Sequence, residues 1–174
     1  MEYSKYNILL RFLHWMMTIL FFALIAAGFS MRHYMSGEQK WEVYAMYKAM
    51  GITFLFLAGL RFLVRVFSKD PTSPGFVGKF TGLLTSPVHY FLHIFMFAVP
   101  ISGYIMSVSS GKEIRWFFDL TVPSLLPQNK QVASLPHEAH FWLAYIALGF
   151  VGLHIMRFLK HLIFDRANLL RKII

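Results

Sequence analysis

Four long apolar segments divide this chain and constrain its fold more than any other feature. They run at about 12–31, 45–66, 88–108 and 139–163, and none of them contains an aspartate or a glutamate. A helix needs about 20 apolar residues to cross the ~30 Å hydrocarbon core of a bilayer, so each segment is long enough to span it. We therefore predict an all-α integral membrane four-helix bundle, with residues 1–174 forming a single transmembrane domain.

The charge of the chain fits this topology. Charged residues make up only 14% of the sequence, whereas a soluble domain has roughly a quarter. Of the 17 lysines and arginines, eleven lie on the side of the N-terminus, the loop near 67–84 and the C-terminus, and six lie on the opposite side. Because Lys and Arg concentrate in cytoplasmic loops, both termini are predicted to be cytoplasmic. Topology thus accounts for the net charge of +9, and no nucleic-acid partner is indicated.

Two histidines of the last segment, His140 and His154, are fourteen residues apart with no charged residue between them. In a helix this spacing is just under four turns and ~21 Å, so both side chains leave nearly the same face at different depths. His14, near the start of the first segment, lies at a depth that matches that of His154. Ionisable side chains inside a membrane are taken as functional by default. The pattern predicts two sites stacked across the bilayer.

The residues that the chain lacks narrow the chemistry of these sites. There is no cysteine, which excludes iron–sulfur ligation and covalent c-type haem attachment. The segments also lack the carboxylates that a proton relay uses, and zinc sites usually combine histidine with cysteine or carboxylate. Histidines that face one another across apolar helices suit axial ligation of haem iron. Hydrogen-bonded packing is the competing interpretation of any single histidine, and it is favoured for His33 and His161 at the interfaces.

Several stretches of the sequence resemble one family. They are RFLHWMMTIL near the start, YKAMGI after the second loop, HYFLHIFMFAVPISGYIM, and HFWLAYIALGFVGLHIMRFLKH near the end. These stretches resemble the bacterial cytochrome b561 family, which is similar to the cytochrome b subunits of membrane formate dehydrogenases and hydrogenases. The resemblance implies a multi-pass protein of the bacterial inner membrane, with two b-type haems between four helices. It assigns His14 and His154 to the cytoplasmic haem and His140 to the outer haem.

The fourth haem ligand is where this sequence departs from the family. The family usually has a histidine shortly before a glycine, as in HKSLG, and here the stretch YKAMG places Tyr47 at that position. Tyr47 is one candidate ligand, since tyrosine ligates haem iron in catalase and favours the ferric state. Lys48, His137 or His33 are candidates for replacing it. The outer haem is otherwise five-coordinate or absent.

The resemblance also implies which electron donor and acceptor the protein uses. Relatives of this stand-alone size oxidise superoxide at the outer face and pass the electron to ubiquinone or another membrane quinone. Lys48 and Arg115 are candidates for steering the superoxide anion, or for anchoring at the interface. His89, His161 and Lys79 are candidates for hydrogen bonds to the quinone on the cytoplasmic side.

Two other functions stay open at this stage. One is a cytochrome b subunit that anchors a soluble dehydrogenase or hydrogenase, in which a redox partner protein takes the place of superoxide. The other is a non-redox helical membrane protein without haem, which leaves the matched depths of the three embedded histidines to coincidence. In all cases membrane lipid surrounds the chain.

Overall fold

The computed structural model describes residues 7–68, 87–117, 120–127 and 134–163 of the chain. These residues form four helices, namely α1 (Ile8–His33), α2 (Gly37–Phe67), α4 (Pro87–Ser109) and α5 (Ser134–Ile163). Each helix contains one of the predicted apolar segments, and all four are long and apolar enough to cross a membrane. The all-α four-helix fold class is confirmed.

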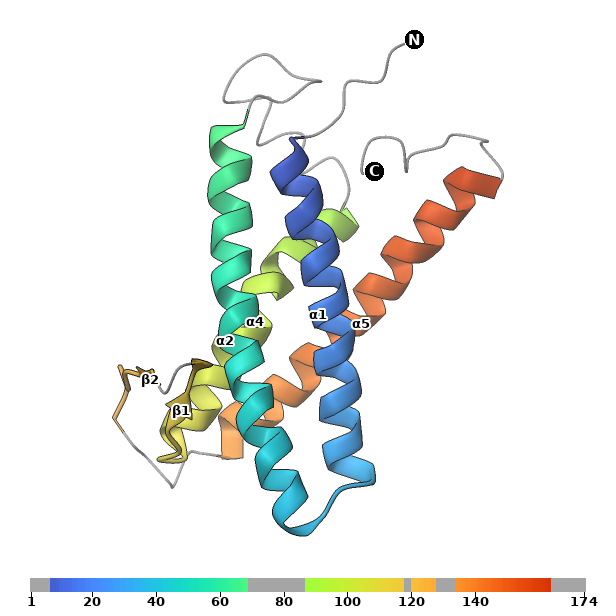
Figure 1. Cartoon of the computed structure of the whole chain (residues 1–174). Helices are drawn as coiled ribbons and strands as arrows, with labels where there is room; N and C mark the ends of the chain where they lie inside the picture. The colour runs from blue at the N-terminus through green and yellow to red at the C-terminus, as the bar shows by residue number, and fades with distance from the viewer. Residues whose placement is uncertain (1–6, 69–86, 118–119, 128–133, 164–174) are drawn as a thin grey trace.

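Helix α1 begins at a capped end and is joined to α2 by a short turn. The Asn7 side chain accepts a hydrogen bond from the Leu9 N–H at 2.9 Å, which satisfies one of the N–H groups that a helix start leaves unpaired. After α1 ends at His33, Gly37 adopts a φ of +67°, which a glycine tolerates without strain. This allows α2 to return antiparallel to α1 within a few residues, as Figure 1 shows.

Helices α1 and α2 pack together as one pair, and α4 and α5 pack together as the other. The two pairs meet where α2 packs on α4. The cluster of most buried apolar side chains lies between α1 and α2 and includes Leu13, Met17, Phe54 and Leu57. Helices α4 and α5 pack through aromatic rings, with the Phe150 centroid 4.9 Å from that of Phe91. Most other large apolar side chains stay exposed, which is the arrangement expected of helices that face lipid.

The two ends of the bundle differ in what covers them. Helix α1 begins, and α5 ends, at one end, which we call the terminal end (Figure 1). The opposite end, the hairpin end, carries the strands β1 (Ile114–Arg115) and β2 (Thr121–Val122), which pair antiparallel. Ile114 is 2% exposed, and the Trp116 indole N–H donates to the Thr53 hydroxyl of α2 at 2.9 Å. These contacts attach the hairpin to α2.

Candidate functional site

One cavity of about 440 Å³ extends between the four helices. Its volume lies within the ~300–1,000 Å³ range typical of ligand pockets. The lining is mainly apolar, with side chains such as Phe21, Leu92, Met96 and Val151, and its polar groups include histidines and tyrosines. A largely apolar cavity with a few polar groups is what a large planar cofactor needs.

Four histidines from three helices line the cavity toward the terminal end. His14 comes from α1, His89 and His93 come from α4, and His154 comes from α5. The rings of His89 and His154 lie edge to face, with centroids 5.0 Å apart. The predicted partners His14 and His154 thus line the same cavity, and the structure adds two further histidines from α4.

His93 was assigned no role from the sequence, although its position signals one. It follows His89 by four residues, so both lie on one face of α4. The His93 Nδ1–H donates to the His89 carbonyl at 2.6 Å. Arg61 of α2 also lines the cavity, and its guanidinium donates to the Leu10 carbonyl at 2.8 Å, one turn before His14. This bond ties α2 to the turn of α1 that carries the histidine.

His140 and Tyr47 face each other toward the hairpin end of the cavity. The Tyr47 Oη lies 3.3 Å from the His140 Nε2, and the two rings meet edge to face at 85°. The tyrosine ring rests against α1, since a Cβ at Gly28 would lie 3.6 Å from it. The two positions for which the family resemblance predicts a ligand pair are therefore in direct contact.

The other candidates for the fourth ligand are placed less favourably. The Lys48 ammonium lines the cavity but donates to the Glu113 carbonyl in the hairpin segment. The His137 side chain is 63% exposed and lies 3.9 Å from the Glu138 carboxylate. His33 is exposed and packs on the ring of Phe29 with centroids 4.4 Å apart. Neither of these two histidines lines the cavity, so Tyr47 is the candidate that reaches His140.

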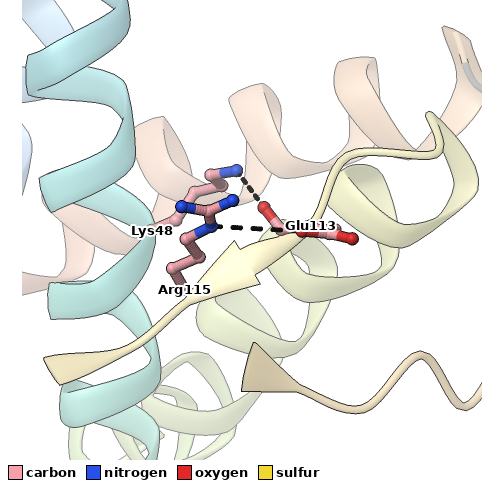
Figure 2. A network of polar contacts seen from close by, with 3 residues as sticks. All are labelled: Lys48, Glu113 and Arg115. Atoms are coloured by element: carbon pink, nitrogen blue, oxygen red, sulfur yellow. Dashed lines mark hydrogen bonds and ion pairs between the residues drawn. The ribbon is translucent and has the colours of Figure 1, made fainter. Parts of the chain in front are cut away.

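Two cations contact Glu113 at the hairpin end, as Figure 2 shows, and a third, Lys112, precedes it in the chain. Lys48 donates to the Glu113 carbonyl, and the Arg115 Nε lies 4.0 Å from its carboxylate. Lys112 lies over the ring of Trp41, 4.8 Å from its centroid. Among these four described residues, three carry a positive charge and one a negative charge. Lys112 had no assigned role in the sequence, because only the fold brings it beside Lys48.

The predicted quinone residues are described only in part. His89 lines the cavity and contacts the ring of His154. Lys79 lies outside the described residues, and the side chain of His161 does so as well, although its backbone belongs to α5. Of the three candidates, His89 is the one whose side chain the structure describes.

The chain is similar to known proteins over nearly its whole length. A family model described as prokaryotic cytochrome b561 matches residues 5–174. A protein of Escherichia coli (strain K12) named cytochrome b561 homolog 2 is 29% identical over 173 residues, which cover 98% of this chain and 92% of that protein. Both matches include all four helices and the cavity between them.

Proposed function

The chain belongs to the prokaryotic cytochrome b561 family, and on this premise we propose that it passes electrons across the membrane from superoxide to a quinone. The family identifies it as a b-type cytochrome for electron transfer and as a multi-pass protein of the inner membrane. The donor, the acceptor, the number of haems and the cytoplasmic location of the terminal end are parts of the proposal. The observation that carries it is that the cavity between the four helices contains a possible ligand pair toward each end.

The residues that line the cavity are of the kinds that hold b-type haem. Neutral imidazole is a common axial ligand of haem iron, and tyrosine is a known one. At the terminal end, His14 and His154 would hold one haem, and at the hairpin end His140 and Tyr47 would hold the other. A bound haem supplies reversible one-electron redox chemistry at its iron. The apolar lining of the cavity excludes water and lowers the local dielectric around both sites.

The two sites are related by the geometry of α5. His140 and His154 belong to this one helix, fourteen residues and therefore ~21 Å apart along its axis. This separation covers most of the ~30 Å hydrocarbon core. One helix thus sets the distance between the two proposed electron sites.

The cations at the hairpin end support a small anionic donor. Arg115 lies beside the Glu113 carboxylate, Lys48 donates to the Glu113 carbonyl and also lines the cavity, and Lys112 lies over the ring of Trp41. Such an excess of positive charge raises the encounter rate of an anion. Superoxide would be oxidised to O₂ by the loss of one electron, and two such electrons with two protons would reduce a quinone to a quinol. Two superoxide anions are therefore consumed for each quinol formed.

At the terminal end, His89 supports binding of the quinone. Its ring contacts that of His154, which places a hydrogen-bonding group beside a proposed haem ligand. A quinone carbonyl accepts hydrogen bonds, and a histidine N–H is a suitable donor. His161 and Lys79 stay predicted as further contacts on this side.

A haem count tests the cofactor part of the proposal. The purified chain is assayed by pyridine haemochrome together with protein quantification, and two b-type haems per chain are expected. His154→Ala and His140→Ala are each expected to lower the count by one. The matched control is His137→Gln, three residues from His140 on the same helix but exposed and outside the cavity lining, which is expected to keep both haems. A wild-type chain without haem would refute the proposal.

A second assay tests the reaction. Reconstituted protein is supplied with superoxide and an oxidised quinone, and O₂ release and quinol formation are followed together. Two superoxide anions are expected per quinol. Full haem loading without superoxide-dependent quinone reduction would refute superoxide as the donor and favour a protein donor, as in an anchor subunit.

A further inference from the structure

The segment of α4 from Val99 to Gly103 lies against the ring of His140. We propose that this segment is the positioning element of His140, with the Val99 carbonyl and the Ser102 hydroxyl fixing Nδ1 and Gly103 providing room for the ring. The inference deepens the outer site of the proposed function and rests on it wherever haem is concerned. The arrangement of the His140 ring itself follows from contacts within the chain.

Hydrogen bonding determines which ring nitrogen of His140 carries the proton. Its Nδ1 lies 3.0 Å from the Val99 carbonyl oxygen and 2.9 Å from the Ser102 Oγ. A carbonyl oxygen only accepts hydrogen bonds, so the contact requires a proton on Nδ1. Neutral imidazole has one such proton, which leaves a lone pair on Nε2. That lone pair points toward the Tyr47 Oη, 3.3 Å away.

Ser102 completes the arrangement from a buried position. It is 8% exposed, and its hydroxyl donates to the Val99 carbonyl at 2.7 Å. Its oxygen lone pairs then face the His140 Nδ1–H. A buried hydroxyl has little access to water, so its bonds to protein groups hold its orientation. The carbonyl and the hydroxyl together restrain the rotation of the imidazole ring.

Gly103 allows the ring to approach α4. A Cβ built at this position would lie 3.0 Å from the His140 Cε1 and 3.3 Å from its Nδ1. An alanine therefore displaces the ring from the Val99 carbonyl. Gly149 of α5 provides a matched comparison, because a Cβ at that position meets nothing within 4 Å.

The first experiment measures how firmly the full-length protein holds its outer haem. Haem release to an excess of a haem-scavenging apoprotein is followed for Gly103→Ala and Ser102→Ala. Partners of this kind typically contribute about 10–100-fold to metal affinity, so release from the outer site is expected to be at least about tenfold faster in both variants. The controls Gly149→Ala and Ser110→Ala are expected to match the wild type. Ser110, directly after α4, donates a similar bond back to the helix, to the Met106 carbonyl, and does not line the cavity.

A second measurement separates this inference from the haem proposal. The dithionite-reduced, ¹⁵N-histidine-labelled chain is examined by NMR, with His140→Gln used to assign the signal. The wild type is expected to carry the proton on Nδ1, whether or not the outer site holds haem. If the wild type binds fewer than two haems, the proposal of an outer haem fails. The position of the proton on the His140 ring still tests whether the α4 segment positions that ring. A proton on Nε2, or unchanged haem release in Gly103→Ala with two haems bound, would overturn this inference.

Discussion

Tyr47 is the residue that most sharply tests the proposed outer site. Tyr47→Phe removes only the Oη and keeps the ring, which rests against Gly28 on α1, so packing is preserved. The loss is then the 3.3 Å contact between Oη and the His140 Nε2, or, where Nε2 holds iron, the bond that the oxygen would make to that iron. An anionic oxygen ligand favours ferric iron, so its removal is expected to raise the midpoint potential of the outer haem.

The size of this shift separates a ligand from a hydrogen-bond partner. A neutral hydrogen bond contributes about 0.5–1.5 kcal/mol, and a one-electron couple shifts by ~59 mV for each 1.4 kcal/mol. A tyrosine that contributes one hydrogen bond near the outer haem without ligating its iron therefore accounts for no more than about 65 mV. A phenolate that ligates the iron is expected to exceed this limit, and its loss is expected to change the oxidised spectrum as well.

The assay is a spectroelectrochemical titration of the purified protein with a haem count on the same sample. Tyr47→His is expected to give two similar low-spin haems, since it restores the residue that the family usually has. Tyr145→Phe, on the same helix as His140 but outside the cavity lining, is the control and is expected to match the wild type. A Tyr47→Phe protein with two haems, an unchanged oxidised spectrum and a shift below about 65 mV would show that Tyr47 is not a ligand.

Three further predictions concern the rest of the molecule. His14→Ala is expected to lose the haem of the terminal end and to retain the component of lower potential, as measured by redox titration. Trp116→Phe removes the hydrogen bond from the indole N–H to Thr53, which contributes about 1 kcal/mol. Its loss is expected to speed proteolysis of the hairpin roughly fivefold. An unchanged rate would show that this bond does not hold the hairpin. Because salt screens exposed charges, the rate of superoxide consumption is expected to fall as ionic strength rises. The fall is expected to be less steep in Lys112→Gln and Arg115→Gln than in the wild type. Rates that do not depend on salt would count against electrostatic steering.

Much of the fold could be predicted from the sequence because a membrane limits the choices. Lipid offers no hydrogen bonds to the backbone, so a long apolar segment has to form a helix, and each of the four segments does. On a helix of known rise, the fourteen-residue spacing of His140 and His154 corresponds to a separation of ~21 Å along the axis. These two histidines and His14 line one cavity, as expected of groups that are too polar to face lipid.

The details of the outer site could not be predicted, because they depend on how the helices are rotated against one another. The preference for Tyr47 over Lys48 follows from the approach of α2 to α5, and from the hairpin segment whose Glu113 carbonyl binds the lysine. The role of Val99 belongs to a backbone carbonyl, which every residue has and no sequence pattern marks. Gly103 carries only a weak signal, since a glycine within a helix has several possible causes.

The structure makes the two ends of α5 chemically unequal, and this bears on the direction of electron flow. At the terminal end, His154 contacts the ring of His89 and shares the cavity with His14, and a neutral imidazole would bring no negative charge to an iron there. At the hairpin end, His140 faces a phenol oxygen from α2. An anionic ligand at one haem lowers its potential relative to a bis-histidine haem, because it stabilises the ferric state. With Tyr47 as a ligand, electrons therefore move downhill from the hairpin end to the terminal end, which is the direction that reduction of a quinone by an outer donor requires.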